Sequence, residues 1–294
     1  MSCLLLGAGG RLGRELKKAL AERCSVTAFG HAEADIGDEA AMTALVDRLR
    51  PDAIVNAAAW TDVTGAETHK AEAYRANWTG VGVLARLARR FDIPLLHYST
   101  DYVFSGEGDL PWRETDPTAP LGVYGASKLA GEATFLASGA RGAIIRVGWL
   151  HSGEKDFVSA ILSRALTGAP LTVVNNQWGT PTEAAALARW TALSLSALWS
   201  TEGTRVVHYV ESGDYVSRFE MADYLLRRAE AFLEQRGDQE KASLCRRAYK
   251  TMSGAVLNDG IRPCNCRLVP TVDSRFSAFS AWKEGVDKSV EKMI

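Results

Sequence analysis

Tyr124 and Lys128 are the residues whose types and spacing point most directly to chemistry. Residues four apart on a helix share one face, so the Lys128 ammonium is expected near the Tyr124 phenol. A free tyrosine has a pKa of about 10, and a nearby positive charge lowers it toward the working range of an acid–base group. The Thr100 hydroxyl adds a hydrogen-bond donor for a carbonyl oxygen. These parts fit hydride transfer at a carbon–oxygen bond beside a nicotinamide.

A glycine-rich turn follows the first apolar run of the chain. Gly7, Gly10 and Gly13 come directly after residues 3–6, and their bare backbone lets a pyrophosphate approach the start of a helix. Such a turn is weak evidence by itself, because glycines serve any tight strand-to-helix turn. The order and spacing of this turn, residues 99–104 and the Tyr-x-x-x-Lys pair together favour the catalytic interpretation.

The elements that must position these residues alternate along the first half of the chain. Short apolar runs alternate with helical patterns, which is typical of βαβ units around a parallel sheet. We expect strands at residues 3–6, 25–29, 52–56, 94–98 and 142–147, and helices after Gly13, at 38–49, at 71–90 and from Tyr124 through Glu132. The fold class is therefore α/β, a doubly wound (Rossmann) parallel sheet of five or six strands.

The rhythm changes after residue 149, which indicates a smaller C-terminal substrate lobe. We expect helices at 156–167, 183–199 and 217–236, strands at 170–174 and 206–210, and a charged surface excursion at 237–251. The predicted organisation is a dinucleotide-binding domain over residues 1–150 and a mainly substrate-binding lobe over 151–294. Residues 183–210 are expected to pack back onto the first domain.

Small, hydroxylic or aromatic residues follow four of the expected strands. Ligands of open α/β sheets bind outside the carboxyl ends of the strands, so these residues should meet at one crevice. For Trp149, core packing is the alternative to a role beside a sugar or base. The residues are the glycine turn, Ala57, Ala58, Ala59 and Thr61 after the third strand, Ser99, Thr100 and Asp101 after the fourth, and Trp149 after the fifth.

The end of the second strand bears on the choice of cofactor. NAD-binding folds usually place an acidic residue there, whereas this strand continues as Gly30-His31 and the first acid is Glu33. Arg11 lies in the glycine turn, where it could reach a 2′-phosphate; a solvated surface charge is the alternative. We predict that NADPH is preferred, or is used as well as NADH.

Composition excludes several other classes of protein. The formal net charge of the 294 residues is −1, which does not favour a nucleic-acid or membrane surface. No apolar run approaches the ~20 residues of a membrane span, and the N-terminus reads as a domain start. The five cysteines are odd in number and scattered, as in a reduced, cytoplasmic protein. No metal ligands are assigned.

Several motifs resemble the extended short-chain dehydrogenase/reductase family, and within it the dTDP-4-dehydrorhamnose reductases. The likeness covers nearly the whole chain, and the two segments most specific to that branch are Ser-Thr-Asp-Tyr-Val-Phe at 99–104 and Gln-x-Gly-x-Pro-Thr at 177–182. The other matching segments are residues 7–13, 35–36, 51–58, 124–128, 146–149 and 262–263.

The resemblance implies a role for each matching residue. Tyr124 would protonate the C4 oxygen of a nucleotide-activated 4-keto-6-deoxyhexose while NAD(P)H delivers hydride, Lys128 would be its partner and ribose anchor, and Thr100 would orient the carbonyl. Asp35 and Ile36 would meet the adenine, Trp149 the sugar and Arg262 the diphosphate. We assign to the cofactor Gly7, Gly10, Arg11, Leu12, Gly13, His31, Asp35, Ile36, Ala57, Ala58, Ala59, Tyr124 and Lys128, and to the substrate Thr61, Thr100, Asp101, Trp149 and Arg262.

Departures from the family pattern fall on the substrate side. They include Asp62, Thr64, Asn175-Asn176 and Cys266, and they keep a related dTDP-deoxysugar 4-ketoreductase as an alternative. A second alternative is a non-catalytic NADP-binding regulatory subunit like that of methionine adenosyltransferase, which shares much of this motif set. Some family members bind Mg²⁺ through interface glutamates, whose positions are not assigned here, and a homodimer is compatible with the resemblance.

Overall fold

Six parallel strands form the central sheet of the computed structural model, which describes residues 1–199, 202–271 and 281–294. The strand order is β10-β5-β4-β3-β1-β2, and every pairing between neighbours is parallel. The doubly wound fold expected from the sequence is confirmed. The strands are β1 (Ser2–Leu6), β2 (Ser25–Phe29), β3 (Ala53–Asn56), β4 (Leu95–Thr100), β5 (Gly142–Val147) and β10 (Thr204–Tyr209).

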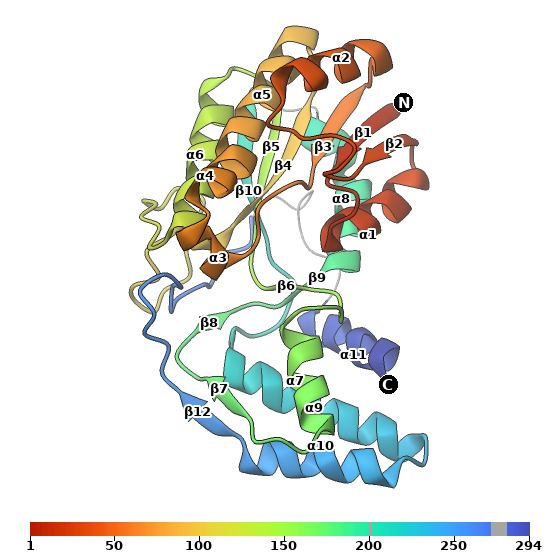
Figure 1. Ribbon diagram of the computed structural model, residues 1–294, viewed down its shortest axis with the longest axis vertical. Coiled ribbons are helices and arrows are strands. Elements are labelled where there is room, and N and C mark those ends of the chain that lie inside the picture. Colours follow the sequence, from red (N-terminus) through yellow and green to blue (C-terminus); the bar gives the residue numbers. More distant parts are fainter. Residues whose placement is uncertain (200–201, 272–280) are drawn as a thin grey trace.

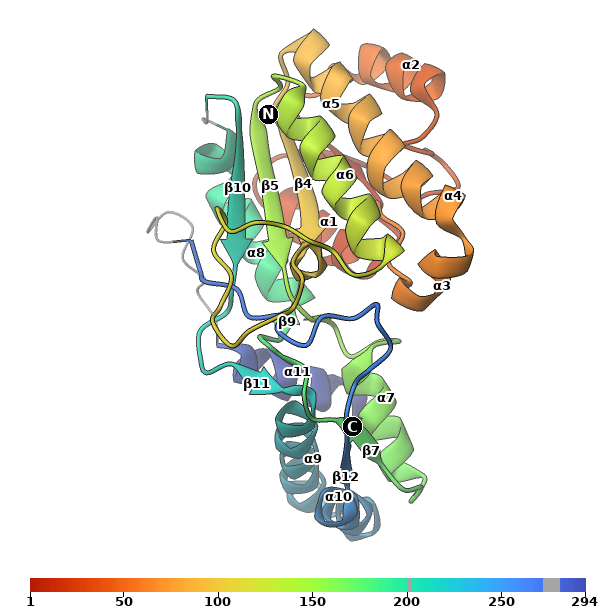
Figure 2. The same cartoon turned by 90° about the vertical axis from the view of Figure 1, so that its left-hand side faces the viewer.

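Helices cover both faces of this sheet (Figure 1). Alternate strand residues point to opposite faces, so Leu5 and Val55 pack on one side and Leu4 and Ile54 on the other. The first side is covered by α1 (Arg11–Ala21) and α8 (Ala184–Trp199). The second is covered by α2 (Glu39–Leu49), α5 (Gly80–Phe91) and α6 (Val123–Ala137); Figure 2 shows α5 and α6 running alongside each other across the strands.

Strand β4 is longer than the sequence suggests. Polar residues at 99 and 100 read as a loop, but they pair with β5 in continuous register, Ser99 opposite Arg146 and Thr100 opposite Val147. The expectation that Thr100 follows the strand is therefore wrong by two residues. Its backbone is fixed by the sheet, and a 3₁₀ turn, Asp101–Val103, follows at once.

The helix expected at 71–90 is interrupted. It consists of α4 (Lys70–Tyr74), a π-helical turn (Arg75–Thr79) and α5, and a short helix, α3 (Val63–Thr68), precedes it. The π-helical turn points the Asn77 side chain into the interior. There its Nδ2 donates to the Trp60 carbonyl at 3.1 Å and to Ser127 Oγ at 3.0 Å. π turns of this kind occur frequently at functional sites.

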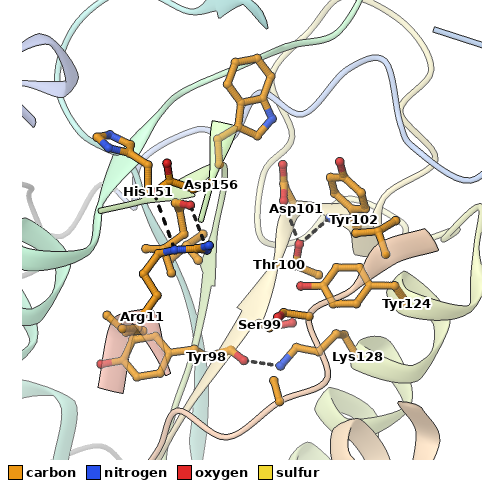
Figure 3. Close-up of a pocket in the computed structure, with 18 of the residues that line it drawn as sticks. Arg11, Tyr98, Ser99, Thr100, Asp101, Tyr102, Tyr124, Lys128, His151 and Asp156 are labelled. Atoms are coloured by element: carbon orange, nitrogen blue, oxygen red, sulfur yellow. Dashed lines mark hydrogen bonds and ion pairs between the residues drawn. The ribbon is translucent and has the colours of Figure 1, made fainter. Parts of the chain in front are cut away.

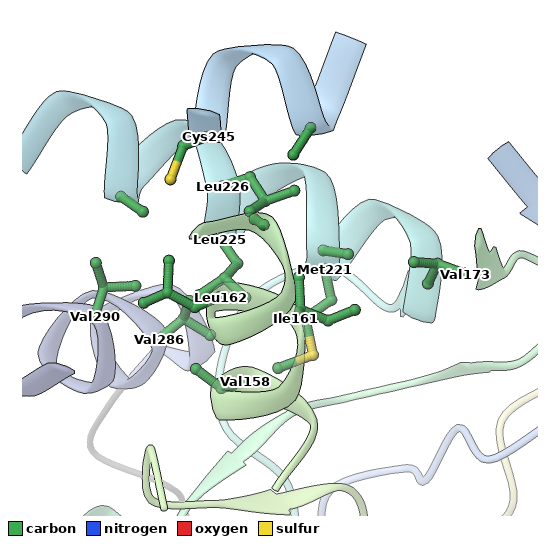
Figure 4. Close-up of a cluster of buried hydrophobic side chains, with 14 of the residues drawn as sticks. Val158, Ile161, Leu162, Val173, Met221, Leu225, Leu226, Cys245, Val286 and Val290 are labelled. Atoms are coloured by element: carbon green, nitrogen blue, oxygen red, sulfur yellow. The ribbon is translucent and has the colours of Figure 1, made fainter. Parts of the chain in front are cut away.

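Four helices make a second hydrophobic core in the C-terminal part of the chain. Figure 4 shows Val158 and Leu162 of α7 facing Leu225 of α9 and Val286 of α11. The helices are α7 (Phe157–Leu166), α9 (Arg218–Gln235), α10 (Gln239–Thr251) and α11 (Trp282–Met293). Three short strand pairs lie outside the central sheet: β6 (Leu150–His151) with β9 (Thr182–Glu183), β7 (Thr172–Val174) with β12 (Ser253–Ala255), and β8 (Trp178–Gly179) with β11 (Val216–Ser217). The lobe expected from the sequence also includes residues 272–280, which lie outside the described ranges.

The surface excursion expected at 237–251 is a helix with a buried face. Ala242, Cys245 and Ala248 of α10 lie in the second core, and their spacing of three residues places them on one side of the helix. The charged residues between them concealed this pattern. All five cysteines are free thiols, and none of the described helices is both long and apolar enough to cross a bilayer.

Two glutamates are buried where the sheet meets the lobe. The backbone N–H of Glu183 donates to Glu211 Oε1 at 2.8 Å, and Glu211 is 1% exposed. Arg189 and Lys288 reach Glu183 Oε2 at 3.6 and 3.8 Å. Burial, together with repulsion from Glu183, raises the pKa of Glu211 to about 8.

Because this carboxyl is buried, we expect the stability of the protein to fall as pH rises. Glu211→Gln should reduce this fall. Between the ordinary value of 4.5 and about 8, the folded protein binds the Glu211 proton and the unfolded chain releases it. The free energy of unfolding therefore falls as pH rises through this range, by at most about 1.4 kcal/mol per pH unit. Urea unfolding across the range should give a shallower decline for the variant. An equally steep decline in both proteins would contradict the assignment.

Candidate active site

A cavity of about 450 Å³ lies at the carboxyl ends of β4 and β5. Figure 3 shows Thr100, Asp101, Tyr124 and Lys128 gathered on one side of it, with Arg11 on the opposite side. The parallel strands bring these side chains together, because all their carboxyl ends open at one edge of the sheet. Of the expected substrate residues, Thr61, Thr100, Asp101 and Trp149 line this cavity.

Tyr124 lies in the first turn of α6 and is half-buried. Its ring meets that of Tyr102 edge-on, with centroids 5.7 Å apart. Burial raises the pKa of Tyr124 to about 12, and hydrogen bonding to Thr100 offsets part of this rise. The expectation that Lys128 lowers the Tyr124 pKa is wrong for this structure, because desolvation dominates. The phenol is therefore a group that keeps its proton.

Lys128 is 2% exposed and is anchored to the sheet. Its Nζ donates to the Tyr98 carbonyl at 2.5 Å and lies 3.4 Å from His97 Nε2. Burial lowers the pKa of Lys128 to about 8, while the charge of Glu132 raises it. The amine is thus held beneath the cavity floor by the strand that carries Thr100.

Thr100 and Asp101 form a hydrogen-bonded pair at the end of β4. Thr100 Oγ1 donates to Asp101 Oδ1 at 2.8 Å and accepts from the Tyr102 N–H at 3.2 Å. Asp101 is 2% exposed, and its Oδ2 has no hydrogen-bond partner. Burial raises the pKa of Asp101 to about 6.

Trp149 is held in an unusual backbone conformation beside this pair. Its φ is +32°, which is rare for a bulky residue and common where a site imposes strain. The Arg218 guanidinium lies 3.7 Å from the centre of its ring, and the indole Nε1 is buried without a partner. The ring is therefore packed and also lines the cavity; its role beside a sugar or base stays a prediction.

The glycine turn is shaped to admit an anion at the start of α1. Gly7 has a φ of +79°, and a Cβ on Gly13 would lie 2.0 Å from the Gly7 carbonyl oxygen. The first N–H groups of α1 have no partner within the helix, and they form a positive end that suits a pyrophosphate. Gly10 and the alanines at 57–59 line both the catalytic cavity and a second cavity of about 560 Å³.

The second cavity collects most of the other residues assigned to the cofactor. It is lined by His31, Asp35 and Ile36 together with Gly7 and Arg75. Asp35 accepts from Arg75 Nη2 at 2.8 Å, and this bond holds the pKa of the Asp35 carboxyl below its ordinary value. The two cavities continue one another across the glycine turn, which gives an extended dinucleotide room along the sheet edge.

The side chain of Arg11 does not reach the second cavity. Its Nη2 donates to the Lys155 carbonyl at 2.8 Å, and its Nε lies 3.8 Å from Asp156 Oδ2. The guanidinium is held by the loop after β6, and its contact with a 2′-phosphate stays a prediction. It is not a solvated surface charge. Its backbone remains at the start of α1, and Leu12 lines the catalytic cavity.

A third cavity, of about 400 Å³, opens beside the first. Tyr102, Phe157 and Arg218 line both cavities. Arg262 lines only the third, where it forms an ion pair with Asp259 and donates to Thr64 Oγ1 at 2.7 Å. The remaining lining is largely apolar: Ile161, Val173, Val174 and Leu257, with Thr172 and Gln177.

Sequence reasoning missed two residues of this site. Arg218 read as an ordinary helix residue, although an arginine in the first turn of α9 is unfavourable for the helix dipole. Asn77 read as part of a long helix, although asparagine is disfavoured in helix interiors. Among the described residues there is no cluster of three His, Cys, Asp or Glu side chains suited to a metal ion, so no Mg²⁺ ligands are assigned.

The geometry of the glycine turn predicts different effects for two alanine substitutions. Gly13→Ala places a methyl group against the Gly7 carbonyl, and this overpacking should lower the free energy of unfolding by about 1–3 kcal/mol. Gly9→Ala is the matched control, since nothing lies within 4 Å of its added Cβ; it should change stability by no more than about 0.5 kcal/mol. Urea unfolding measures both. Equal effects at the two positions would contradict the described turn.

Comparisons with known proteins find a matching family model and similar proteins. The family model of the RmlD substrate binding domain matches residues 1–293. A dTDP-4-dehydrorhamnose reductase of Escherichia coli (strain K12) is 41% identical over 219 residues, 72% of this chain and 73% of its own. One of Mycobacterium tuberculosis (strain H37Rv) is 41% identical over 226 residues, 74% and 72% of the two chains.

Solved structures show the same fold. A dTDP-4-dehydrorhamnose reductase from Clostridium acetobutylicum superimposes with a TM-score of 0.86 at 25% identity, covering 100% of this chain and 99% of that one. A reductase of the same name from Bacillus anthracis, crystallised in complex with NADP, gives a TM-score of 0.84 at 24% identity with the same coverage.

Proposed function

The chain belongs to the family of the RmlD substrate binding domain, and from this premise we propose that it reduces the 4-keto group of dTDP-4-dehydrorhamnose with NADPH. Relatives of that name about 40% identical support the substrate. The observation that carries the proposal is the meeting of Thr100, Tyr124 and Lys128 in one cavity beside the glycine turn.

The residues around the glycine turn fit a nicotinamide dinucleotide. The contact between Gly13 and Gly7 forms a cradle that any Cβ would fill, and the free N–H groups of α1 suit its pyrophosphate. Asp35, Ile36 and His31 would hold the adenosine end in the second cavity. When bound, the cofactor supplies hydride for C4 of the sugar. NADPH is proposed as the preferred form, with NADH also used, because no acidic residue ends β2.

The chain's own residues then handle the carbonyl oxygen. Tyr124 donates the proton to the C4 oxygen, and its high pKa keeps that proton in place until charge develops on the oxygen. Thr100 donates a hydrogen bond to the same oxygen and holds it in the cavity. Lys128, fixed to the Tyr98 carbonyl, would hold the ribose of the cofactor, the anchoring role that the family resemblance implies.

Replacing the proposed acid should separate chemistry from binding. Tyr124→Phe should lower kcat by about 10²-fold or more, the usual scale for loss of a general acid, with little change in KM. Tyr102→Phe is the matched control, since it removes a neighbouring phenol whose ring lies edge-on to Tyr124; its kcat should fall much less. Steady-state oxidation of NADPH with the keto-sugar measures both. A kcat near wild type for Tyr124→Phe would rule out the proposed acid.

Arg218 is proposed to meet the diphosphate of the substrate. It lies between the catalytic cavity and the third, largely apolar one. The sugar of a bound nucleotide sugar would lie in the catalytic cavity and its base in the third. Its Nε donates to Gln177 Oε1 at 3.1 Å, and it forms no ion pair with any described residue. Arg262, in contrast, is already neutralised by Asp259. The positive charge available to phosphate is therefore that of Arg218.

Two matched substitutions test this assignment. Arg218→Met should raise KM for the nucleotide sugar about tenfold or more, as expected for loss of a charge-assisted hydrogen bond, and kcat should be largely retained because the contact is the same before and during reaction. Arg262→Met should have the smaller effect on KM. The opposite ranking would return the diphosphate to Arg262, as the family resemblance suggests.

A further inference from the structure

The Thr100 hydroxyl has one proton, and the structure directs it away from the substrate. A hydroxyl donates one hydrogen bond and accepts two. Here Thr100 Oγ1 donates to Asp101 Oδ1 at 2.8 Å and accepts from the Tyr102 N–H at 3.2 Å. In this arrangement Thr100 cannot donate to a carbonyl oxygen.

A neutral Asp101 reverses this arrangement. A protonated carboxyl donates through its O–H, so Asp101 would give its proton to the Thr100 hydroxyl oxygen. That bond and the Tyr102 N–H then fill both lone pairs of Thr100. The Thr100 proton is then released toward the cavity.

The surroundings of Asp101 favour the neutral form. On the side of β5, a Cβ added at Gly148 would lie 3.5 Å from the unpartnered Oδ2. The Cys266 thiol faces the carboxyl from the C-terminal lobe, and Arg218 acts on it from α9 at a distance too long for an ion pair. The Thr100 hydrogen bond, Cys266 and Arg218 all lower the pKa of Asp101, but burial outweighs them and raises it to about 6.

We propose that Asp101 is a positioning residue whose proton sets the direction of the Thr100 hydrogen bond, so that Thr100 donates to the substrate carbonyl beside Tyr124 only when Asp101 is neutral. The inference rests on the proposed function for its reaction, and on the two hydrogen bonds of Thr100 for its geometry. A keto-sugar entering the cavity excludes water and favours the neutral carboxyl further.

The pH dependence of turnover tests the inference. In the wild type, kcat/KM should fall by about tenfold, the worth of roughly one hydrogen bond, as pH rises above about 6. Asp101→Asn should abolish this step, because its amide N–H donates to Thr100 at every pH. Thr100→Val should also abolish the step, and its kcat/KM should be lower at every pH. Thr100→Ser keeps the hydroxyl and should keep the step. A step that persists in Asp101→Asn or in Thr100→Val overturns the inference.

An infrared measurement without substrate tests the proton itself. The difference spectrum of wild type minus Asp101→Asn should contain the carbonyl stretching band of a neutral carboxylic acid, and this band should disappear as pH rises through about 6. If this band is absent at pH values above the ordinary pKa of an aspartate, the inference is overturned. Presence of the band with no turnover of any keto-sugar by the wild type contradicts the proposed reaction and leaves the proton assignment standing. Cooperative thermal unfolding of each variant confirms that it is folded.

Discussion

The hydrogen bond from the buried Lys128 ammonium to the Tyr98 carbonyl is the contact on which the rest of the site depends. A charged group in the interior requires a partner, and this one is supplied by the strand that ends in Thr100. The bond therefore fixes the first turns of α6 against the carboxyl end of β4. The π turn reinforces it from the other side, because Asn77 holds both Ser127 of α6 and the loop at Trp60. Tyr124 and Thr100 meet as a consequence.

Burial then changes the three titratable groups in the same sense, toward their neutral forms. It raises the pKa of Tyr124 to about 12 and of Asp101 to about 6, and lowers that of Lys128 to about 8. Tyr124 therefore keeps its proton at neutral pH. A neutral donor in a desolvated cavity responds strongly to charge developing on a neighbouring oxygen. The same exclusion of water makes the direction of the Thr100 hydrogen bond depend on the proton of Asp101.

The sheet and the position of the site could be predicted from the sequence, because both follow from local patterns. Apolar runs marked all six strands, and the residues just after β1, β3, β4 and β5 had to meet at one edge. Features set by tertiary contacts could not be read in this way. The extension of β4 through Thr100 depends on pairing with β5, and the direction of Arg11 depends on carbonyl groups more than a hundred residues away. The position of Arg218 at the site could be recognised only from the fold, which places the start of α9 between two cavities.

The fate of the hydride tests the central claim most directly. NADPH carrying deuterium at the transferred position of its nicotinamide ring should be incubated with the protein and dTDP-4-dehydrorhamnose, and the product sugar examined by NMR. The account predicts one deuterium at C4 of the sugar for each NADPH consumed. Oxidation of NADPH without deuterium at C4, or with deuterium at another carbon, would contradict it.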